Sequence, residues 1–230
     1  YWKDGGVAIT GEAAWGFTRE FLRMWERMGG KFPQPYDDYR PQKAIEGKGY
    51  CQPFSDGPDN NPVNTAEDIF LHLINRAQHT LRITSPYLAI DEPMLRALCT
   101  AGDSGVKVQL MMPGTPDHKF AYLVAETYFG ELMRHGVEIY TFTPGFLHGK
   151  TVLADNEIAV IGTVNMDYRS FQLHYECGTI LYGENARRGL EEDMDSIIAQ
   201  SRRVTISSWK ARPWLRKLTG MFLRLFAMWM

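Results

Sequence analysis

The sequence predicts an α/β domain, in which helices flank a largely covered sheet. Short apolar runs typical of strands alternate with amphipathic segments of helical spacing along most of the chain. An apolar fraction of 44% with 13% aromatic residues is that of a globular protein rather than a disordered one. A chain of 230 residues is also long enough to bury a sizeable core. No internal repeat is evident.

The first 48 residues are organised differently from the rest. Residues 1–9 begin as a strand remnant, and a helix with an apolar stripe follows until Gly29 and Gly30 stop it. We expect the stripe to be core packing; its members are Ala14, Phe17, Phe21, Met24, Trp25 and Met28. Residues 31–48 combine prolines and charges with no apolar period, which predicts a linker and a domain boundary.

The strand–helix order is regular from residue 49 to residue 203, which we take as one domain. Its predicted strands cover residues 50–54, 81–85, 106–112, 137–142, 147–161 as a hairpin, and 174–182. Its predicted helices have apolar faces within residues 66–77, 94–98, 121–132 and 186–198.

The last segment, residues 204–230, is a basic amphipathic tail. No acidic residue follows Asp195, whereas seven basic residues do: Arg202, Arg203, Lys210, Arg212, Arg216, Lys217 and Arg224. An interfacial helix on anionic lipid has this mixture of cations, tryptophans and large apolar residues. A terminal helix packed on the body is the alternative, and the many large apolar residues favour the membrane surface.

Composition argues against several other classes of protein. A formal net charge of -2 does not suit a general electrostatic grip on nucleic acid, so no nucleic acid is expected as a partner. Cys51, Cys99 and Cys177 are far apart, which predicts neither a zinc site nor a disulfide framework. No run reaches the ~18 apolar residues that a bilayer span needs. The chain begins at Tyr1 without a signal-peptide pattern, and we expect a fragment.

The most informative stretch is residues 147–165, L-H-G-K-T-V-L-A-D-N-E-I-A-V-I-G-T-V-N. His148 and Lys150 stand at i and i+2, so on a strand they project from the same face. A nucleophile or proton donor and a cation then face one point, which suits phosphoryl transfer. Asp155 begins a turn, and residues 158–161 form the returning strand of a hairpin.

Other side chains are placed to complete such a site. Thr163 and Asn165, with the N–H groups of the helical stretch that follows them, suit phosphate oxygens. Glu176 lies on the next strand, where its carboxylate is a candidate to hold the second nitrogen of His148. Tyr87 lies at the carboxyl end of a strand, where open α/β sheets collect ligands. It either contacts a lipid substrate or is an ordinary half-buried aromatic residue.

The arrangement H-x-K-x4-D-x6-G-T-x-N resembles the signature of the phospholipase D superfamily. The resemblance implies His148 as nucleophile or general acid, and Lys150 and Asn165 as phosphate binders. It implies Thr163 as a supporting hydroxyl and Glu176 as the partner of the histidine. Asp155 matches the signature's aspartate and joins the catalytic candidates, although in that family it is more plausibly structural than a proton carrier.

Longer stretches resemble the C-terminal half of bacterial cardiolipin synthases. They are W-K-D with I-T-G-E-A-A, then S-P-Y-L-A-I-D-E, G-F-L-H-G-K and G-T-V-N-M-D-Y-R-S-F-Q-L-H-Y-E. This resemblance implies the second half of a pseudo-twofold, two-domain enzyme with a phospholipase D-like sheet. Residues 1–30 would end the first such domain, 31–48 would link the two, and 49–203 would form the second. The first signature motif would lie upstream.

The same resemblance implies an activity and a location. Two phosphatidylglycerols would be joined into cardiolipin through a phosphohistidine intermediate, with release of glycerol and with no metal or other cofactor. The enzyme would work at the bacterial cytoplasmic membrane, on an anionic surface. Its second histidine would come from the first-motif half of the same enzyme or from a second copy of the chain.

Two alternatives remain. One is a homodimeric, single-motif phosphodiesterase or nuclease of the same superfamily. The apolar residues around His148, namely Phe142, Phe146 and Leu147, suit acyl chains better than a polyanion and so favour the transferase. The other alternative is a catalytically silent half that binds a partner or a membrane through its tail. The intact set of site residues argues against it.

Overall fold

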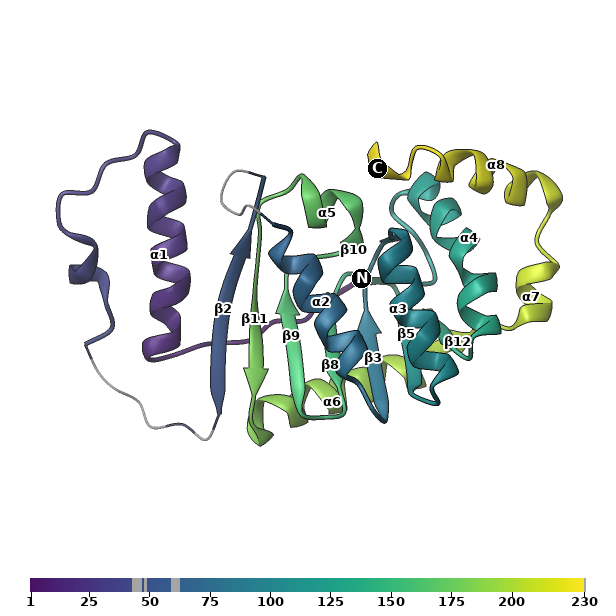
Figure 1. The fold of residues 1–230 in the computed structure, drawn as a ribbon, viewed down its shortest axis with the longest axis horizontal. Coiled ribbons are helices and arrows are strands. Elements are labelled where there is room, and N and C mark those ends of the chain that lie inside the picture. The colour runs from purple at the N-terminus through teal and green to yellow at the C-terminus, as the bar shows by residue number, and fades with distance from the viewer. Residues whose placement is uncertain (43–46, 48, 59–62, 230) are drawn as a thin grey trace.

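A mixed eight-stranded sheet forms the centre of the computed structural model, which describes residues 1–42, 47, 49–58 and 63–229. Its strands are β2 (Tyr50–Asp56), β3 (Thr80–Thr84), β5 (Lys107–Pro113), β6 (Glu138–Phe142), β8 (Thr151–Ala154), β9 (Ile158–Gly162), β11 (Glu176–Tyr182) and β12 (Ser201–Arg203). They are ordered β12-β6-β5-β3-β8-β9-β11-β2 (Figure 1). Strands β3, β5 and β6 are parallel, and every other neighbouring pair is antiparallel.

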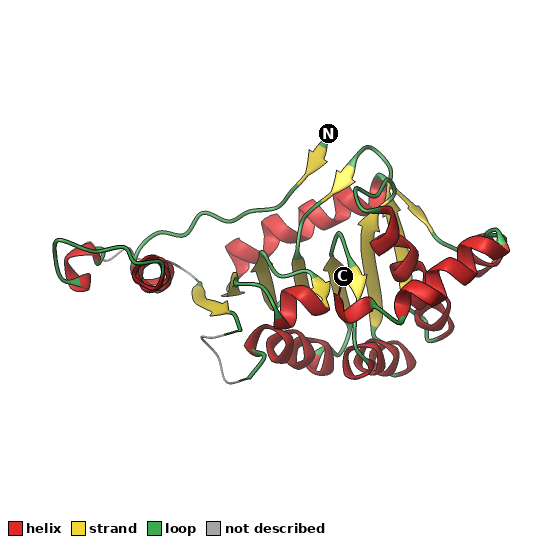
Figure 2. Cartoon of the chain, turned by 90° about the horizontal axis from the view of Figure 1, so that it is seen from above, coloured by secondary structure: helices red, strands yellow, loops and turns green. Residues whose placement is uncertain are grey.

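Helices cover both faces of this sheet, which confirms the predicted α/β class (Figure 2). One face carries α2 (Thr65–Arg76), α3 (Glu92–Asp103) and α4 (Lys119–Arg134). The other face carries α6 (Glu184–Ala199).

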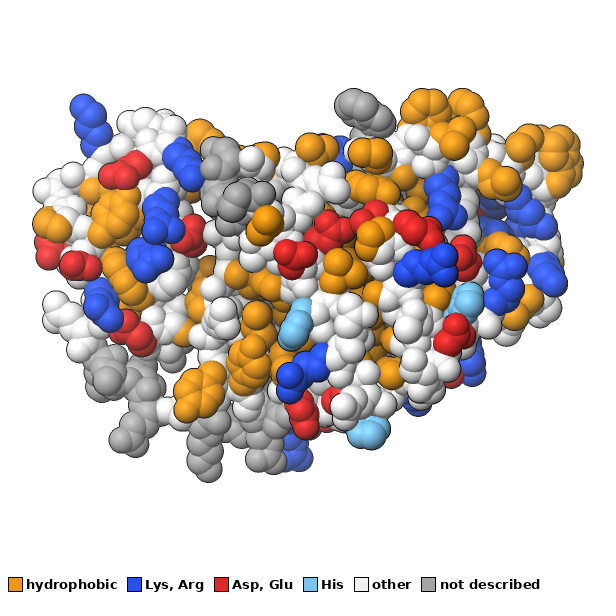
Figure 3. Space-filling view, viewed as in Figure 1, with side chains coloured by type: hydrophobic (Ala, Val, Ile, Leu, Met, Phe, Trp, Pro, Cys, Tyr) orange, Lys and Arg blue, Asp and Glu red, His pale blue; other side chains and the backbone are white. Residues whose placement is uncertain are grey.

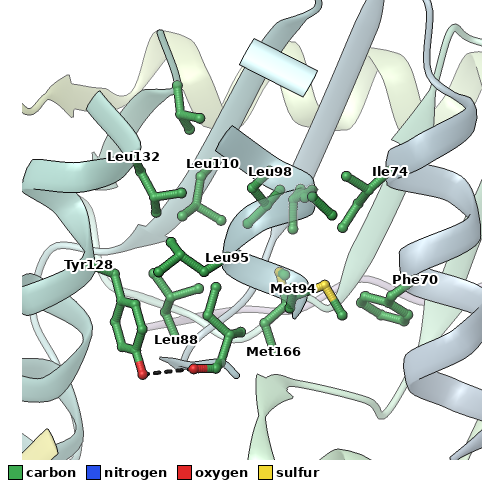
Figure 4. Close-up of a cluster of buried hydrophobic side chains, with 14 of the residues drawn as sticks. Phe70, Ile74, Leu88, Met94, Leu95, Leu98, Leu110, Tyr128, Leu132 and Met166 are labelled. Carbon is green, nitrogen blue, oxygen red and sulfur yellow. Dashed lines mark hydrogen bonds between the residues drawn. The ribbon is translucent and has the colours of Figure 1, made fainter. Parts of the chain in front are cut away.

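The buried side chains form two clusters, one on each face of the sheet. Because side chains alternate along a strand, β5 directs Leu110 into one cluster and Met111 into the other. Figure 4 shows part of the larger cluster, where Leu95 and Leu132 from neighbouring helices meet Leu110. The hydroxyl of Tyr128, which is buried in this cluster, donates a hydrogen bond to the Ile90 carbonyl at 2.9 Å.

Two short ladders lie where β3 and β5 end. Strand β1 (Trp2–Lys3) pairs in parallel with β7 (Phe146–Leu147), and β4 (Leu88–Ala89) pairs in parallel with β10 (Met166–Asp167). Ser85, the residue after β3, fixes the second ladder, because its Oγ accepts a hydrogen bond from the Met166 N–H at 3.1 Å. The short helix α5 (Tyr168–Gln172) follows β10. These segments position the candidate site.

Helix α1 (Glu12–Arg27) packs beside β2 at the end of the sheet (Figure 1). The two elements approach closely at Gly16, where an added Cβ would lie 2.9 Å from a side-chain carbon of Pro53. The expectation that the apolar stripe of this helix is core packing is wrong. Phe21 is 62% exposed and Met28 is 76% exposed, and only Leu22 of the helix is buried.

The predicted linker is only partly described, because residues 43–46 and 48 lie outside the described residues. Its first part is not wholly irregular: residues 36–39 form the 3-10 helix η1 (Tyr36–Tyr39). The Tyr36 hydroxyl donates a hydrogen bond to Glu26, which ties this turn back to α1.

The C-terminal tail packs on the body, as one of its two interpretations expected. After β12 it forms α7 (Ile206–Lys210), α8 (Trp214–Arg224) and the 3-10 helix η2 (Ala227–Trp229). Helix α8 lies along α4 and keeps large apolar side chains on its outer side, seen as orange spheres along the upper right border of Figure 3. Within the described residues, no helix is both long and apolar enough to cross a membrane.

Candidate active site

The register of the short β1–β7 ladder places Asp4 beside His148. Lys3 is paired with Leu147, so the next residues along the two strands, Asp4 and His148, emerge side by side. The His148 N–H donates to the Lys3 carbonyl at 2.7 Å and extends the ladder by one bond. The ammonium of Lys3 also forms an ion pair with Asp193 of α6, which anchors the N-terminal strand.

His148 is held by a carboxylate, but not by the one predicted. Its Nδ1 lies 2.9 Å from Oδ2 of Asp4, whereas the sequence suggested Glu176 for this role. An ionised carboxylate at Nδ1 favours the tautomer with the proton on Nδ1, which leaves the Nε2 lone pair for chemistry. The ring of Trp2 lies 5.0 Å from the imidazole between centroids and helps to fix its orientation. The side chain of His148 remains 31% exposed.

Lys150 lies next to His148, as predicted, although the two residues fall between β7 and β8 rather than within a strand. Its Nζ donates to the His148 carbonyl at 2.5 Å, and the residue is only 8% exposed. Burial lowers the pKa of Lys150, and the nearby carboxylates of Asp4 and Glu176 partly offset that effect. A buried ammonium is suited to donate charge-assisted hydrogen bonds to an anionic group.

Glu176 is bonded to Thr163 instead of to the histidine. The Thr163 hydroxyl donates to the Glu176 carboxylate and accepts a hydrogen bond from the Cys177 N–H at 3.0 Å. Nδ1 of His174 lies 3.7 Å from the same carboxylate. Glu176 is 8% exposed, and its negative charge raises the pKa of Lys150, so the carboxylate lies near the Lys150 ammonium.

The start of α5 is not an open phosphate site. Asp167 caps it, because its Oδ1 accepts a hydrogen bond from the Ser170 N–H at 2.8 Å. The expectation that these N–H groups bind phosphate is therefore wrong for Ser170. Asn165 lies beside this cap and its Nδ2 donates to the Ser170 Oγ at 3.1 Å. Among the described residues, no group bonds to the buried Oδ1 of Asn165.

Asp155 is separated from the other predicted site residues by the length of β8. It occupies the β8–β9 turn, where Asp155 and Asn156 both have φ of 52°, as in a type I′ hairpin. Its carboxylate accepts hydrogen bonds at 2.8 Å from three consecutive backbone N–H groups, those of Gln78, His79 and Thr80. The catalytic role considered for Asp155 is therefore not supported by its position, and its bonds fix the hairpin against the start of β3.

We predict that Asp155→Ala destabilises the fold without removing activity. Burial alone would raise the pKa of Asp155, but the hydrogen bonds from Thr80, Gln78 and His79 lower it below its ordinary value. Loss of these bonds should cost about 1 to 3 kcal/mol in the free energy of unfolding at neutral pH. Because the folded pKa is depressed, this contribution exists above about pH 4 and disappears as the pH falls through the folded pKa. Urea unfolding of both proteins at several pH values measures it; an equal loss at every pH would contradict the assignment.

Tyr87 lies at the rim of the site. Its hydroxyl donates to Oδ2 of Asp117 at 2.6 Å, and burial, followed by this bond, raises the pKa of Tyr87. Asp117 also acts on the pKa of Lys150, and the ring of His118 lies 6.1 Å from the Tyr87 ring. Tyr87 is thus near the site, in a pair that sequence reasoning did not foresee.

The apolar residues before His148 do not form an open surface. Phe142 is 1% exposed, Phe146 7% and Leu147 0%. They are core residues, so the argument that they suit acyl chains better than a polyanion is wrong. The large exposed apolar neighbour of the imidazole is instead Trp2, which is 60% exposed.

Sequence reasoning missed Asp4, although a signal for it exists. The stretch D-G-G-V-A-I-T-G-E from Asp4 matches E-C-G-T-I-L-Y-G-E from Glu176 in its first acid and in its closing Gly-Glu. In both stretches that glycine has a positive φ, 86° at Gly11 and 117° at Gly183, and a helix of 16 residues follows. The two stretches thus share an acid, a glycine with positive φ and a following helix, although residues 4–10 lie in no strand whereas residues 176–182 form β11.

Comparison with known proteins identifies the family. A family model described as "Cardiolipin synthase, PLD-like domain" matches residues 70–198, more than half of the chain. The chain belongs to this phospholipase D-like family. A cardiolipin synthase of Clostridium perfringens is 35% identical over 234 residues, covering 98% of this chain and 48% of its own length. The chain thus spans about half the length of the curated relatives it matches.

Solved structures of two other proteins share the fold. A phosphatidylserine synthase from Haemophilus influenzae superimposes with a TM-score of 0.66 at 15% identity, over 92% of this chain and 54% of its own. Nuc from Salmonella typhimurium, a phospholipase D family member, gives 0.57 at 18% identity, over 68% of this chain and 98% of its own. These likenesses confirm the phospholipase D-like sheet predicted from the sequence.

Proposed function

We propose that this chain is the C-terminal half of a phosphatidyl transferase that forms cardiolipin from two phosphatidylglycerols. Membership of the cardiolipin synthase family supports an enzyme of this kind. We further propose that it works at the bacterial cytoplasmic membrane, where its substrates lie. The half-site itself consists of His148, Lys150, Asn165, Thr163, Glu176 and Asp4.

One observation carries this proposal: Asp4 holds Nδ1 of His148 at 2.9 Å, beside the buried ammonium of Lys150. Nε2 is then available to attack phosphorus or, once protonated, to donate to a leaving oxygen. The ammonium of Lys150 is suited to the charge that develops on the phosphoryl oxygens. Asn165 is proposed as a second phosphate binder, and Tyr87 as a contact to the lipid headgroup.

The similarity of the two stretches suggests how a second histidine completes the site. Asp4 begins the first stretch and holds the histidine of the H-x-K motif in the other half. By the same relation, Glu176 would hold Nδ1 of the histidine in the absent H-x-K motif. This reading explains why Glu176 lies near Lys150 and yet is bonded to Thr163 rather than to His148. It also makes residues 1–30 the end of a first domain and 49–203 the second.

The reaction then proceeds in two displacements. Nε2 of one histidine forms a bond to the phosphorus of a phosphatidylglycerol, the bond from phosphorus to the glycerol oxygen breaks, and the other histidine protonates the glycerol that leaves. The glycerol hydroxyl of a second phosphatidylglycerol then attacks the same phosphorus and gives its proton to the second histidine. The phosphorus–nitrogen bond breaks, cardiolipin is released and both histidines are restored. Either His148 or its counterpart can be the nucleophile.

The test uses phosphatidylglycerol labelled in its terminal glycerol. The chain is assayed alone and together with a polypeptide that supplies the first H-x-K half. We expect one glycerol released for each cardiolipin formed, and only in the combined sample. Release of glycerol with phosphatidic acid and no cardiolipin would make the protein a hydrolase instead. A dimer of the chain that cleaves bis(p-nitrophenyl) phosphate and forms no cardiolipin would establish the single-motif phosphodiesterase.

A further inference from the structure

We propose that the outer face of α8 binds the surface of an anionic lipid bilayer and holds the active site toward it. The outer face of α8 is defined by Trp214, Leu215, Leu218, Met221, Phe222 and Leu225. The proposal rests on the proposed function only in that the substrate is a membrane lipid. It adds which surface of the chain makes the contact.

The inner face of α8 is fixed to the body, so the helix cannot turn its apolar side inward. Arg216 pairs with Glu126 of α4 at 2.7 Å, and Arg212 pairs with the same carboxylate at 3.0 Å. At Gly220 the two helices approach so closely that an added Cβ would lie 2.6 Å from the Leu123 carbonyl oxygen. Arg224 lies over the ring of Tyr128 at 3.9 Å.

The outer face is consequently presented to solvent as one apolar stripe. At about 100° per residue, its six members fall within an arc of about 120° on the side opposite Gly220 and Arg216. All six are more than half exposed; Leu225 is 78% exposed and Trp214 69%. Phe226 and Met228 continue the stripe beyond the helix and are 46% and 58% exposed. A helix of this kind lies in the plane of a membrane interface rather than across it.

The positive charge near α8 favours an anionic bilayer over a protein partner on the outer face of the helix. From residue 196 to residue 230 the sequence has no acidic residue and seven basic ones, of which Arg203, Arg212 and Arg216 form ion pairs with carboxylates of the body. In Figure 3 blue side chains gather below the orange border at this end of the molecule. Exposed Lys210 closes α7, and its carbonyl accepts a hydrogen bond at 2.6 Å from the ammonium of Lys217. Cations behind an apolar edge with a tryptophan match the order of headgroups and acyl chains.

The orientation of this face suits the active site. Helix α8 runs along the upper border of the molecule in Figure 1. Strands β3 and β9 point toward this side of the molecule and β8 and β11 begin at the same end of the sheet, so His148, Lys150 and Glu176 lie at that end. A bilayer bound by the outer face of α8 would therefore meet the edge of the sheet that holds the site.

Flotation of the chain with vesicles tests the proposal. The two probes are vesicles of phosphatidylglycerol with phosphatidylcholine and vesicles of phosphatidylcholine alone. We expect binding to the anionic vesicles, and a fall of about tenfold or more in partitioning for Leu218→Asp and for Leu225→Asp, each of which removes a large side chain from the apolar phase. Tyr50→Asp is the matched control. Tyr50 is 83% exposed at the beginning of β2, on the opposite border of the sheet, and its replacement should leave binding unchanged.

Each other outcome overturns the proposal. Equal flotation of the Leu218→Asp protein and the unaltered chain would exclude this face from lipid binding. Equal binding to both kinds of vesicle would remove the role of charge. If Leu218→Asp instead converts a lipid-free oligomer into a monomer on analytical ultracentrifugation, the occupant is protein. Transfer assays in detergent micelles separate the two proposals, because they test the chemistry without a bilayer and should not respond to Leu218→Asp.

Discussion

Replacement of His148 by alanine is expected to reduce cardiolipin formation by at least ~10⁴-fold, because in the proposed mechanism the residue is either the nucleophile or the group that protonates the leaving glycerol. No other residue of the proposed half-site is assigned either role. Initial rates with phosphatidylglycerol in micelles, with product followed by mass spectrometry, measure the loss. Vesicle flotation of the same variant should be unchanged, since His148 lies outside the outer face of α8.

His135→Ala is the matched control for this prediction. His135 also pairs its Nδ1 with an aspartate, Asp103, at 2.8 Å, but it does so at the end of α4 on the surface. Its replacement should leave transfer unchanged, and retained synthesis by His148→Ala would refute the proposed chemistry. A phosphatidyl ester of p-nitrophenol separates the two roles, because its leaving group needs no proton. Release of p-nitrophenol by His148→Ala would make His148 the acid, and no release would make it the nucleophile.

Local sequence patterns were sufficient to predict the sheet, its covering helices and the position of His148 beside Lys150. The spacing of apolar residues along a strand or helix depends on which side chains face the core. Residues close together in the sequence carry this spacing, so it can be recognised without the tertiary structure. The hairpin at Asp155 was also predictable, because Asp-Asn tolerates the left-handed backbone of a tight turn. The structural role of Asp155 had been favoured within the family, and its three backbone partners now supply the reason.

The contacts that failed prediction are those between distant segments. Asp4 and His148 are 144 residues apart and meet only because a two-residue parallel ladder forms between their strands. Glu176 was predicted instead, because it lies on the next strand after the hairpin and because the family resemblance implied it. Similarly, Phe146 and Leu147 are apolar and adjacent to His148, but a composition argument cannot tell a core residue from the wall of an open site.

Helix α1 shows that an apolar stripe does not identify the partner of a helix. The stripe predicted that another surface packs against it, but the sequence pattern is the same whether that surface belongs to the same domain or to another one. Here most of the stripe is exposed. In the proposed two-half architecture, a similar half of the enzyme would cover α1, as α6 covers the sheet here. A helix at such a junction would carry the same apolar stripe as a core helix.

The second large effect is expected at Asp4, which we propose as a positioning residue. Asp4→Asn retains the size of the side chain but removes the acceptor that orients His148, so kcat should fall by about 10²-fold to 10³-fold with KM nearly unchanged. Burial alone would raise the pKa of Asp4, but its bonds to His148 and to the Gly5 N–H lower it below the ordinary value. The carboxylate therefore stays ionised at neutral pH, where the two proteins are compared. Asp103→Asn, which changes the partner of His135, should not affect transfer. A rise in KM at constant kcat would instead place Asp4 in substrate binding.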